Sequence, residues 1–118
     1  MPTAALQAPR AMSYAEFWWR YLAAHRDPRT RGLHYLGTLF GLTALVAAAV
    51  TGDWRWLVAA PIAGYALAWF GHLAFEHNRP ETFGHPGWSL VSDLRMLALF
   101  VSGRLGRELR RTAAGGNR

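Results

Sequence analysis

The sequence is 118 residues long, enough for a single domain, and contains no cysteine, which excludes disulfides, thiolate metal sites and cysteine nucleophiles. Hydrophobic residues make up 52% of it and charged residues only 17%, a composition typical of membrane proteins rather than of soluble ones. The net charge of +6 comes from arginines that flank apolar segments, so we expect no nucleic-acid partner.

The first predicted helix runs from Tyr14 to His25, after a tail of residues 1–12 that we expect to be flexible. Ser13 and Glu16 form a capping box at its start, and Pro28 ends it, because the residue before a proline is pushed out of the α region. The helix is too short and polar to cross a membrane. We expect it to lie in the interface with its aromatic face toward the lipid, and that face carries Tyr14, Phe17, Trp18, Tyr21 and Leu22.

Two long apolar segments follow, Leu33 to Val50 and Leu57 to Phe75. Each is close to the about 20 residues that cross the hydrocarbon core of a bilayer. Gly37 and Gly41 form a G-x-x-x-G pair, which permits close contact between helices. We therefore predict two transmembrane helices in a hairpin. A soluble bundle is the alternative, but a chain this short would struggle to cover two such helices on all sides.

A last helix is predicted from about Leu90 to Leu109, lying in the interface or against the spans, and residues 112–118 form a second flexible tail. The fold class is thus all-α. A single helical membrane domain of residues 13–111 contains the two transmembrane helices, the N-terminal interfacial helix and this C-terminal amphipathic helix.

The distribution of arginine predicts the orientation in the membrane. Five arginines precede the first span, Arg55 alone lies in the turn, and seven follow the second span. The positive-inside bias therefore puts both termini in the cytoplasm. For localisation, we expect a bacterial inner membrane.

This topology brings polar side chains to one membrane face. His34 begins the first span, His72 and Glu76 end the second, and His25 ends the preceding helix at the same level. Ionisable groups within a span are costly and indicate function, and imidazoles with a carboxylate suit iron(II) or zinc. We take His25, His34, His72 and Glu76 as the candidate metal-binding and catalytic residues of a site for one metal ion.

Three further residues are secondary candidates. His77 follows Glu76 but points to another helix face, and His85 lies in a Gly-Pro loop. Asp93 could accept a hydrogen bond from a metal-binding histidine and so orient its ring, or could pair with an arginine.

Two motifs carry a resemblance to a known family. The first is Tyr21-x-x-x-His25-x-x-Pro28 followed by His34, and the second runs from Gly71-His72 to Arg79-Pro80 with Glu76 between them. With the two spans and Ser89, residues 13–105 resemble the 2-hydroxy fatty acid dioxygenases of fatty-acid α-oxidation, the Mpo-like membrane proteins.

The resemblance implies an Fe(II) enzyme that shortens a 2-hydroxy fatty acid by one carbon and releases CO2. His25, His34, His72 and Glu76 become the candidate iron site, and the expected partners are the 2-hydroxy fatty acid, dioxygen and membrane lipid. Arg29, Arg31 or Arg79 would steer the substrate carboxylate. Assembly into a homo-oligomer stays open. The alternatives are a b-type haem protein with His34 and His72 as axial ligands, and a non-catalytic helical membrane protein.

Overall fold

A computed structural model describes residues 12–80 and 84–114, and within these ranges the chain forms helices and no strands, which confirms the all-α class. Of the predicted tails, residues 1–12 and 112–118, residues 1–11 and 115–118 lie outside the described part, whereas Thr112 and Ala113 belong to the last helix. The helices are α2 (Tyr14–Ala23), α3 (Pro28–Thr51), α4 (Arg55–Gly71), α5 (Pro86–Val101) and α6 (Leu105–Ala113), with a π-helical turn, η1 (His72–Glu76), directly after α4.

The start of α2 and the start of α3 form as their sequences predict. The capping box is present: the Glu16 amide donates to Ser13 Oγ, and the Ser13 amide donates to Glu16 Oε1. Asp27 caps α3 by accepting from the Arg29 amide, and Pro28 occupies the first turn, where its missing N–H leaves no bond unmade. The chain therefore turns sharply between α2 and α3, and His25 lies in this turn.

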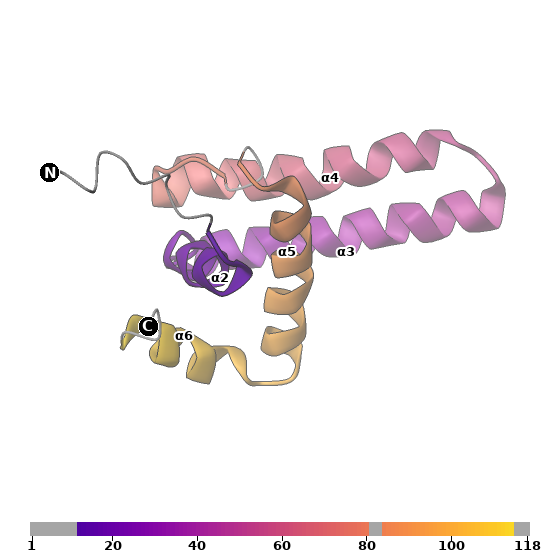
Figure 1. Ribbon diagram of the computed structural model, residues 1–118. Coiled ribbons are helices and arrows are strands. Elements are labelled where there is room, and N and C mark those ends of the chain that lie inside the picture. Colours follow the sequence, from indigo (N-terminus) through magenta and orange to yellow (C-terminus); the bar gives the residue numbers. More distant parts are fainter. Residues whose placement is uncertain (1–11, 81–83, 115–118) are drawn as a thin grey trace, which may run out of the picture.

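Helices α3 and α4 lie side by side and antiparallel (Figure 1). Gly37 of α3 faces Gly64 of α4 so closely that a Cβ on Gly37 would lie 2.5 Å from the Gly64 carbonyl oxygen. A Cβ on Gly41 would lie 3.2 Å from the carbonyl oxygen of Ala60. The G-x-x-x-G pair thus lets the two backbones meet directly.

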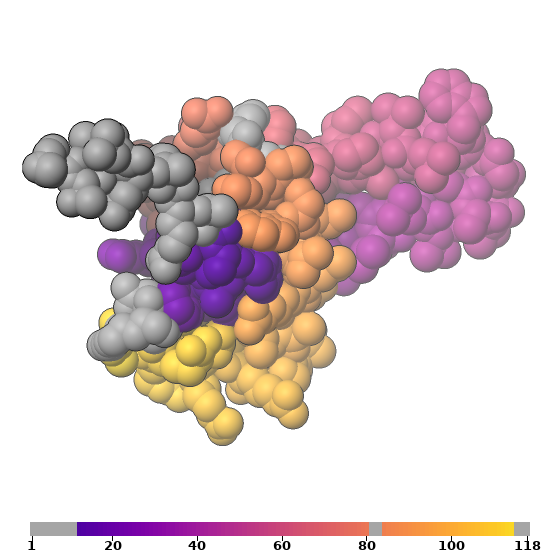
Figure 2. Space-filling view, in the orientation of Figure 1, coloured from indigo at the N-terminus to yellow at the C-terminus, as the bar shows by residue number. Residues whose placement is uncertain are grey.

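The outer faces of α3 and α4 are apolar and uncovered. Helix α3 and the continuous segment formed by α4 and η1 are long and apolar enough to cross a membrane, yet only 17% and 22% of their most apolar stretches are buried. Val50 and Ile62 are among the exposed side chains, and Figure 2 shows the far half of the pair projecting beyond the other helices. The core helix of a soluble protein would be mostly buried.

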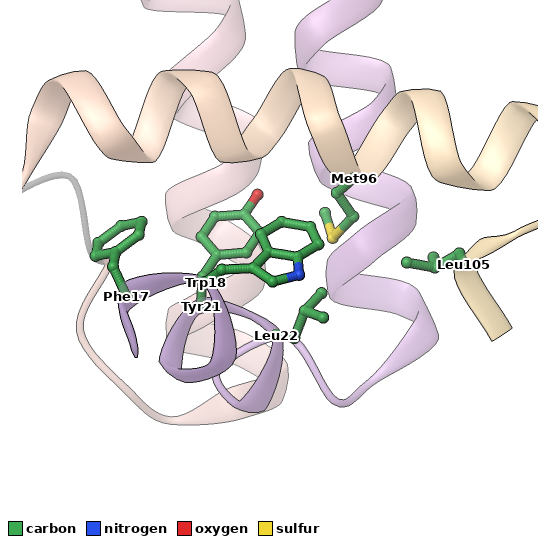
Figure 3. Packing of buried hydrophobic residues seen from close by; sticks show 6 residues of the cluster. All are labelled: Phe17, Trp18, Tyr21, Leu22, Met96 and Leu105. Atoms are coloured by element: carbon green, nitrogen blue, oxygen red, sulfur yellow. The ribbon is translucent and has the colours of Figure 1, made fainter. Parts of the chain in front are cut away.

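The cluster of buried hydrophobic side chains lies at the other end of the molecule, around the aromatic face of α2. Figure 3 shows four α2 side chains that belong to one buried cluster with Met96 of α5 and Leu105 of α6. The four are Phe17, Trp18, Tyr21 and Leu22, all at most 2% exposed. The expected contact of this face with lipid is therefore wrong, because α5 and α6 cover it.

The predicted last helix is two helices. It starts earlier, at Pro86, and breaks after Val101, where Gly103 adopts φ 78°, a left-handed conformation that ends a helix. This break lets α6 fold back toward α2 while α5 crosses the α3–α4 pair (Figure 1). Helix α5 leaves Leu90, Val91 and Phe100 exposed, so of the two helices predicted to lie in the interface, α5 rather than α2 has an uncovered apolar face.

Candidate metal centre

Three histidines from three separate segments meet where α2 and α5 contact the base of the α3–α4 pair. His25 comes from the turn after α2, His34 from α3 and His72 from the first position of η1. They are 1%, 6% and 1% exposed, and each offers one ring nitrogen within 4.8 Å of the others. Such a group could hold a metal ion.

The other ring nitrogen of each histidine is held by an oxygen acceptor. Nδ1 of His25 contacts the Tyr21 carbonyl, Nδ1 of His34 lies 3.2 Å from the Thr30 carbonyl, and Nδ1 of His72 lies 2.7 Å from Asn78 Oδ1. The Asn78 amide is oriented by its own donation to the Ala24 carbonyl. Since these oxygens only accept, each Nδ1 carries the proton and each Nε2 keeps its lone pair for a metal.

The Nε2 atoms of His25 and His34 lie 3.0 Å apart. Two lone pairs at this distance repel unless a proton or a cation lies beside them. Two imidazole nitrogens bound at right angles, each about 2.1 Å from a metal ion, would be about 3 Å apart. Burial and the neighbouring imidazoles lower the pKa of His25 well below its usual range, which keeps it neutral, as a ligand must be. The donor set therefore fits a metal ion.

The π-helical turn explains how His72 meets Asn78. The carbonyl of His72 accepts from the amides of His77 and Asn78, so this turn holds more residues than an α-helical turn. His77 then adopts φ 56°, which ends the helix and brings the Asn78 side chain back to the His72 ring. Single π-helical turns of this kind are frequent at functional sites.

Glu76 is not part of the three-histidine group. Its carboxylate accepts a hydrogen bond from the backbone amide of Asp27, at the turn that carries His25. In this arrangement Glu76 ties η1 to the start of α3 and supports the His25 turn.

The two secondary histidines also lie apart from the group. His77 is exposed. The ring of His85 stacks on Trp88, with 5.0 Å between ring centroids, and meets the Phe17 ring edge-on at 5.4 Å.

The three arginines considered for the substrate carboxylate have different surroundings. Arg31 donates from Nη1 to the carbonyls of His25 and Arg26, at 2.7 and 2.9 Å, and so fixes the His25 turn. Arg29 pairs with Asp27 and lies over the Phe75 ring. Arg79 is exposed after η1.

The carboxylate nearest the histidines in the described chain is Asp93 of α5. Its Oδ1 lies 3.7 Å from Nε2 of His34 and accepts a hydrogen bond from the Tyr21 hydroxyl. Burial raises the pKa of Asp93 to about 7. Asp93 thus faces the ring nitrogen of His34 that is kept for a metal and is too far from it for a hydrogen bond, so it does not orient that ring, and Arg95 approaches Glu108 rather than Asp93. The feature of the sequence that indicates a role for Asp93 is that it is an acidic residue inside an apolar segment.

Comparison with known proteins places the chain in a family. The family described as 2-hydroxy-palmitic acid dioxygenase Mpo1-like matches residues 11–105. The chain belongs to the Mpo1-like family. This confirms the resemblance, and the Mpo1-like name suggests a dioxygenase that acts on a 2-hydroxy fatty acid. No curated protein and no solved structure matches the chain.

Proposed function

We propose that this Mpo1-like protein is an Fe(II)-dependent membrane dioxygenase that shortens 2-hydroxy fatty acids by one carbon. The observation that supports this most strongly is the convergence of three buried imidazoles, each with one ring nitrogen within 4.8 Å of the others and with Nδ1 held by an oxygen. Three imidazole ligands leave coordination positions open, and iron(II) with open positions supplies dioxygen chemistry.

The reaction balances without a further reductant. R–CH(OH)–COOH and O2 give R–COOH, CO2 and H2O, as the bond between the carboxyl carbon and the carbinol carbon breaks. The 2-hydroxy acid supplies all four electrons that reduce O2. This fits a site that needs to admit only the acid and dioxygen.

We assign separate roles to the residues around the centre. His25, His34 and His72 hold the iron. Asp93 accepts a hydrogen bond from the substrate 2-hydroxyl, and the Tyr21 hydroxyl keeps the Asp93 carboxylate in place. We keep Arg29, Arg31 and Arg79 as the arginines that would attract the substrate carboxylate, while Arg31 also fixes the His25 turn and Arg29 also pairs with Asp27.

We infer that α3 and α4 cross the membrane, with the histidines near one surface. With 24 residues, α3 is about 36 Å long, enough for a hydrocarbon core of about 30 Å. Helices α2, α5 and α6 gather at the base of the pair, and all arginines except Arg55 either precede Leu33 in the sequence, Arg29 and Arg31 lying in the first turn of α3, or follow α4. The positive-inside bias therefore puts this end in the cytoplasm, in bacteria at the inner membrane.

Turnover by the purified protein tests this function. The protein in mild detergent, loaded with Fe(II) without air, receives 2-hydroxypalmitate and then oxygen. We expect equal amounts of O2 consumed, CO2 released and the acid one carbon shorter formed. Full iron occupancy without turnover would contradict the proposal.

The haem alternative has its own signature. Two axial imidazoles must lie on opposite faces of the macrocycle, whereas the ring of His25 lies beside both others, 4.3 Å from His34 and 4.4 Å from His72 by centroids. We therefore expect no Soret band in the purified protein, and a stoichiometric Soret band would favour haem over the oxygenase.

A further inference from the structure

A cavity of about 320 Å³ lies between α3, α4 and α5, where α5 crosses the pair (Figure 1). His34 and Asp93 line one end of it, and Leu42 and Leu45 line the α3 side farther along. The cavity is therefore continuous with the candidate metal centre. Its other lining side chains are almost all apolar.

The floor of this groove comes from the residues that let α3 and α4 touch. Gly37, Gly41 and Gly64 all line it, and a Cβ on any of them would point into the α3–α4 contact, so only small residues form the floor. Leucines of α3 and α5 stand at its sides and are themselves partly exposed: Leu42, Leu45, Leu90 and Leu94 are 42%, 46%, 51% and 43% exposed. The groove is thus open along its length toward the uncovered apolar surface of the pair.

The length of the groove matches one lipid leaflet. From His34 to Leu45 is eleven residues of helix, or about 16 Å at about 1.5 Å per residue. Half of a hydrocarbon core of about 30 Å is about 15 Å. A single acyl chain with its polar end at the histidines would therefore reach the far end of the groove without leaving its own leaflet.

We propose that this groove binds the acyl chain of the 2-hydroxy fatty acid in extended form, with the carboxyl end at His34 and Asp93 and the methyl end beside Leu45. That the polar end of the bound chain is a 2-hydroxy acid rests on the proposed function. The substrate enters sideways from the bilayer, and the distance from the histidines to Leu45 sets the preferred chain length.

Photocrosslinking tests the binding mode without turnover. Two forms of 2-hydroxypalmitate, one with a diazirine near the methyl end and one with a diazirine near the hydroxyl, are illuminated with the iron-free protein in lipid nanodiscs. We expect the first to label the α3 peptide around Leu42 and Leu45 and the second to label around Thr38. If both forms label the outward residues Val46 and Val50 as strongly as the groove residues, the proposed binding of the acyl chain in the groove is wrong.

Two matched tryptophan variants test the chain-length role. Leu45→Trp fills the far end of the groove, whereas Val46→Trp adds the same bulk beside it, at a position 62% exposed that does not line the cavity. We expect Leu45→Trp to lower the kcat/KM for 2-hydroxypalmitate relative to 2-hydroxyoctanoate by about tenfold or more. Val46→Trp should leave this ratio near that of the parent protein. An unchanged ratio in Leu45→Trp would overturn the chain-length role.

The two experiments separate the groove from the reaction. End-specific labelling without any turnover by the iron-loaded protein would contradict the dioxygenase function and support the groove. Turnover with labelling spread over the outward face would contradict the groove alone.

Discussion

The hydroxyl of Tyr21 donates a hydrogen bond to the carboxylate of Asp93 and so joins α2 to α5 beside the metal centre. The same tyrosine ring stacks on the imidazole of His25, with 4.0 Å between ring centroids. One side chain of α2 therefore contacts both a candidate ligand and the nearest carboxylate. This explains why the aromatic face of α2 is buried in protein.

Replacing Asp93 tests whether this residue contacts the substrate or binds the metal. Asp93 lies outside the group whose ligand atoms are mutually close, so we expect Asp93→Ala to keep its iron but to lower kcat/KM for 2-hydroxypalmitate by about 100-fold. Asp93→Asn, which keeps an acceptor oxygen, should lose less. Iron content and steady-state kinetics, measured on the same preparations, distinguish the two roles. If Asp93→Ala loses iron and activity in parallel, Asp93 is a metal ligand.

Removing any one of the three clustered imidazoles should empty the metal site. We expect His25→Ala, His34→Ala and His72→Ala to lose most of their bound metal, measured by mass spectrometry after gentle detergent purification. His77→Ala and His85→Ala are the controls, since both histidines lie outside the group. Circular dichroism in detergent checks that the variants remain folded. Retention of metal by all three cluster variants would count against the site.

Asn78 should tune metal affinity without touching the metal. Its Oδ1 accepts from Nδ1 of His72, and such supporting hydrogen bonds typically change metal affinity by about 10- to 100-fold. We expect Asn78→Ala to weaken binding by this factor and Asn78→Asp, which keeps the acceptor, to weaken it less. Competition with a chelator of known affinity measures the effect. If Asn78→Ala and the parent protein bind the metal with equal affinity, the hydrogen bond from His72 to Asn78 does not support metal binding.

The contact between α3 and α4 should not tolerate side chains at Gly37. A Cβ there would meet the Gly64 carbonyl oxygen at 2.5 Å, and the backbone atoms it meets cannot rotate away. We expect Gly37→Ala to lower the free energy of unfolding by about 1–3 kcal/mol. Gly32→Ala is the matched control, because nothing lies within 4 Å of a Cβ there. Thermal unfolding in detergent compares the two, and equal stability would be inconsistent with this contact.

The docking of α6 on α2 should weaken in acid. Glu108 accepts hydrogen bonds from Arg111 and from the Trp18 indole, and these hold its pKa at about 2, below the ordinary 4.5. Since the folded pKa is the lower one, Glu108 stabilises the fold above about pH 5, and this contribution is lost as the pH falls toward 2.

Thermal unfolding from pH 6 to pH 2.5 measures this contribution of Glu108. Glu108→Gln should be less stable than the parent at pH 6 and should depend less on pH. If both proteins respond alike to acid, Glu108 is not the group responsible.

The sequence alone determined the features that depend on near neighbours along the chain. The spacing of apolar residues predicts the helices, the lengths of two segments predict membrane-spanning candidates, and Gly37 with Gly41 predicts the close helix pair. Histidines at the base of two antiparallel helices must lie near one another, so the pairing of His34 with His72 could be foreseen. These inferences need only helical periodicity and the direction of the chain.

Only the tertiary structure decided which groups complete the site and what covers each apolar face. Helical periodicity identifies an apolar face but does not distinguish lipid from protein, and the face of α2 proved to be covered by protein while α5 keeps Leu90, Val91 and Phe100 exposed. The π-helical turn at His72–Glu76 sends Glu76 to the amide of Asp27, and α5 brings Asp93 to His34 from far along the chain. Such contacts depend on how helices cross, and no local pattern encodes the crossing.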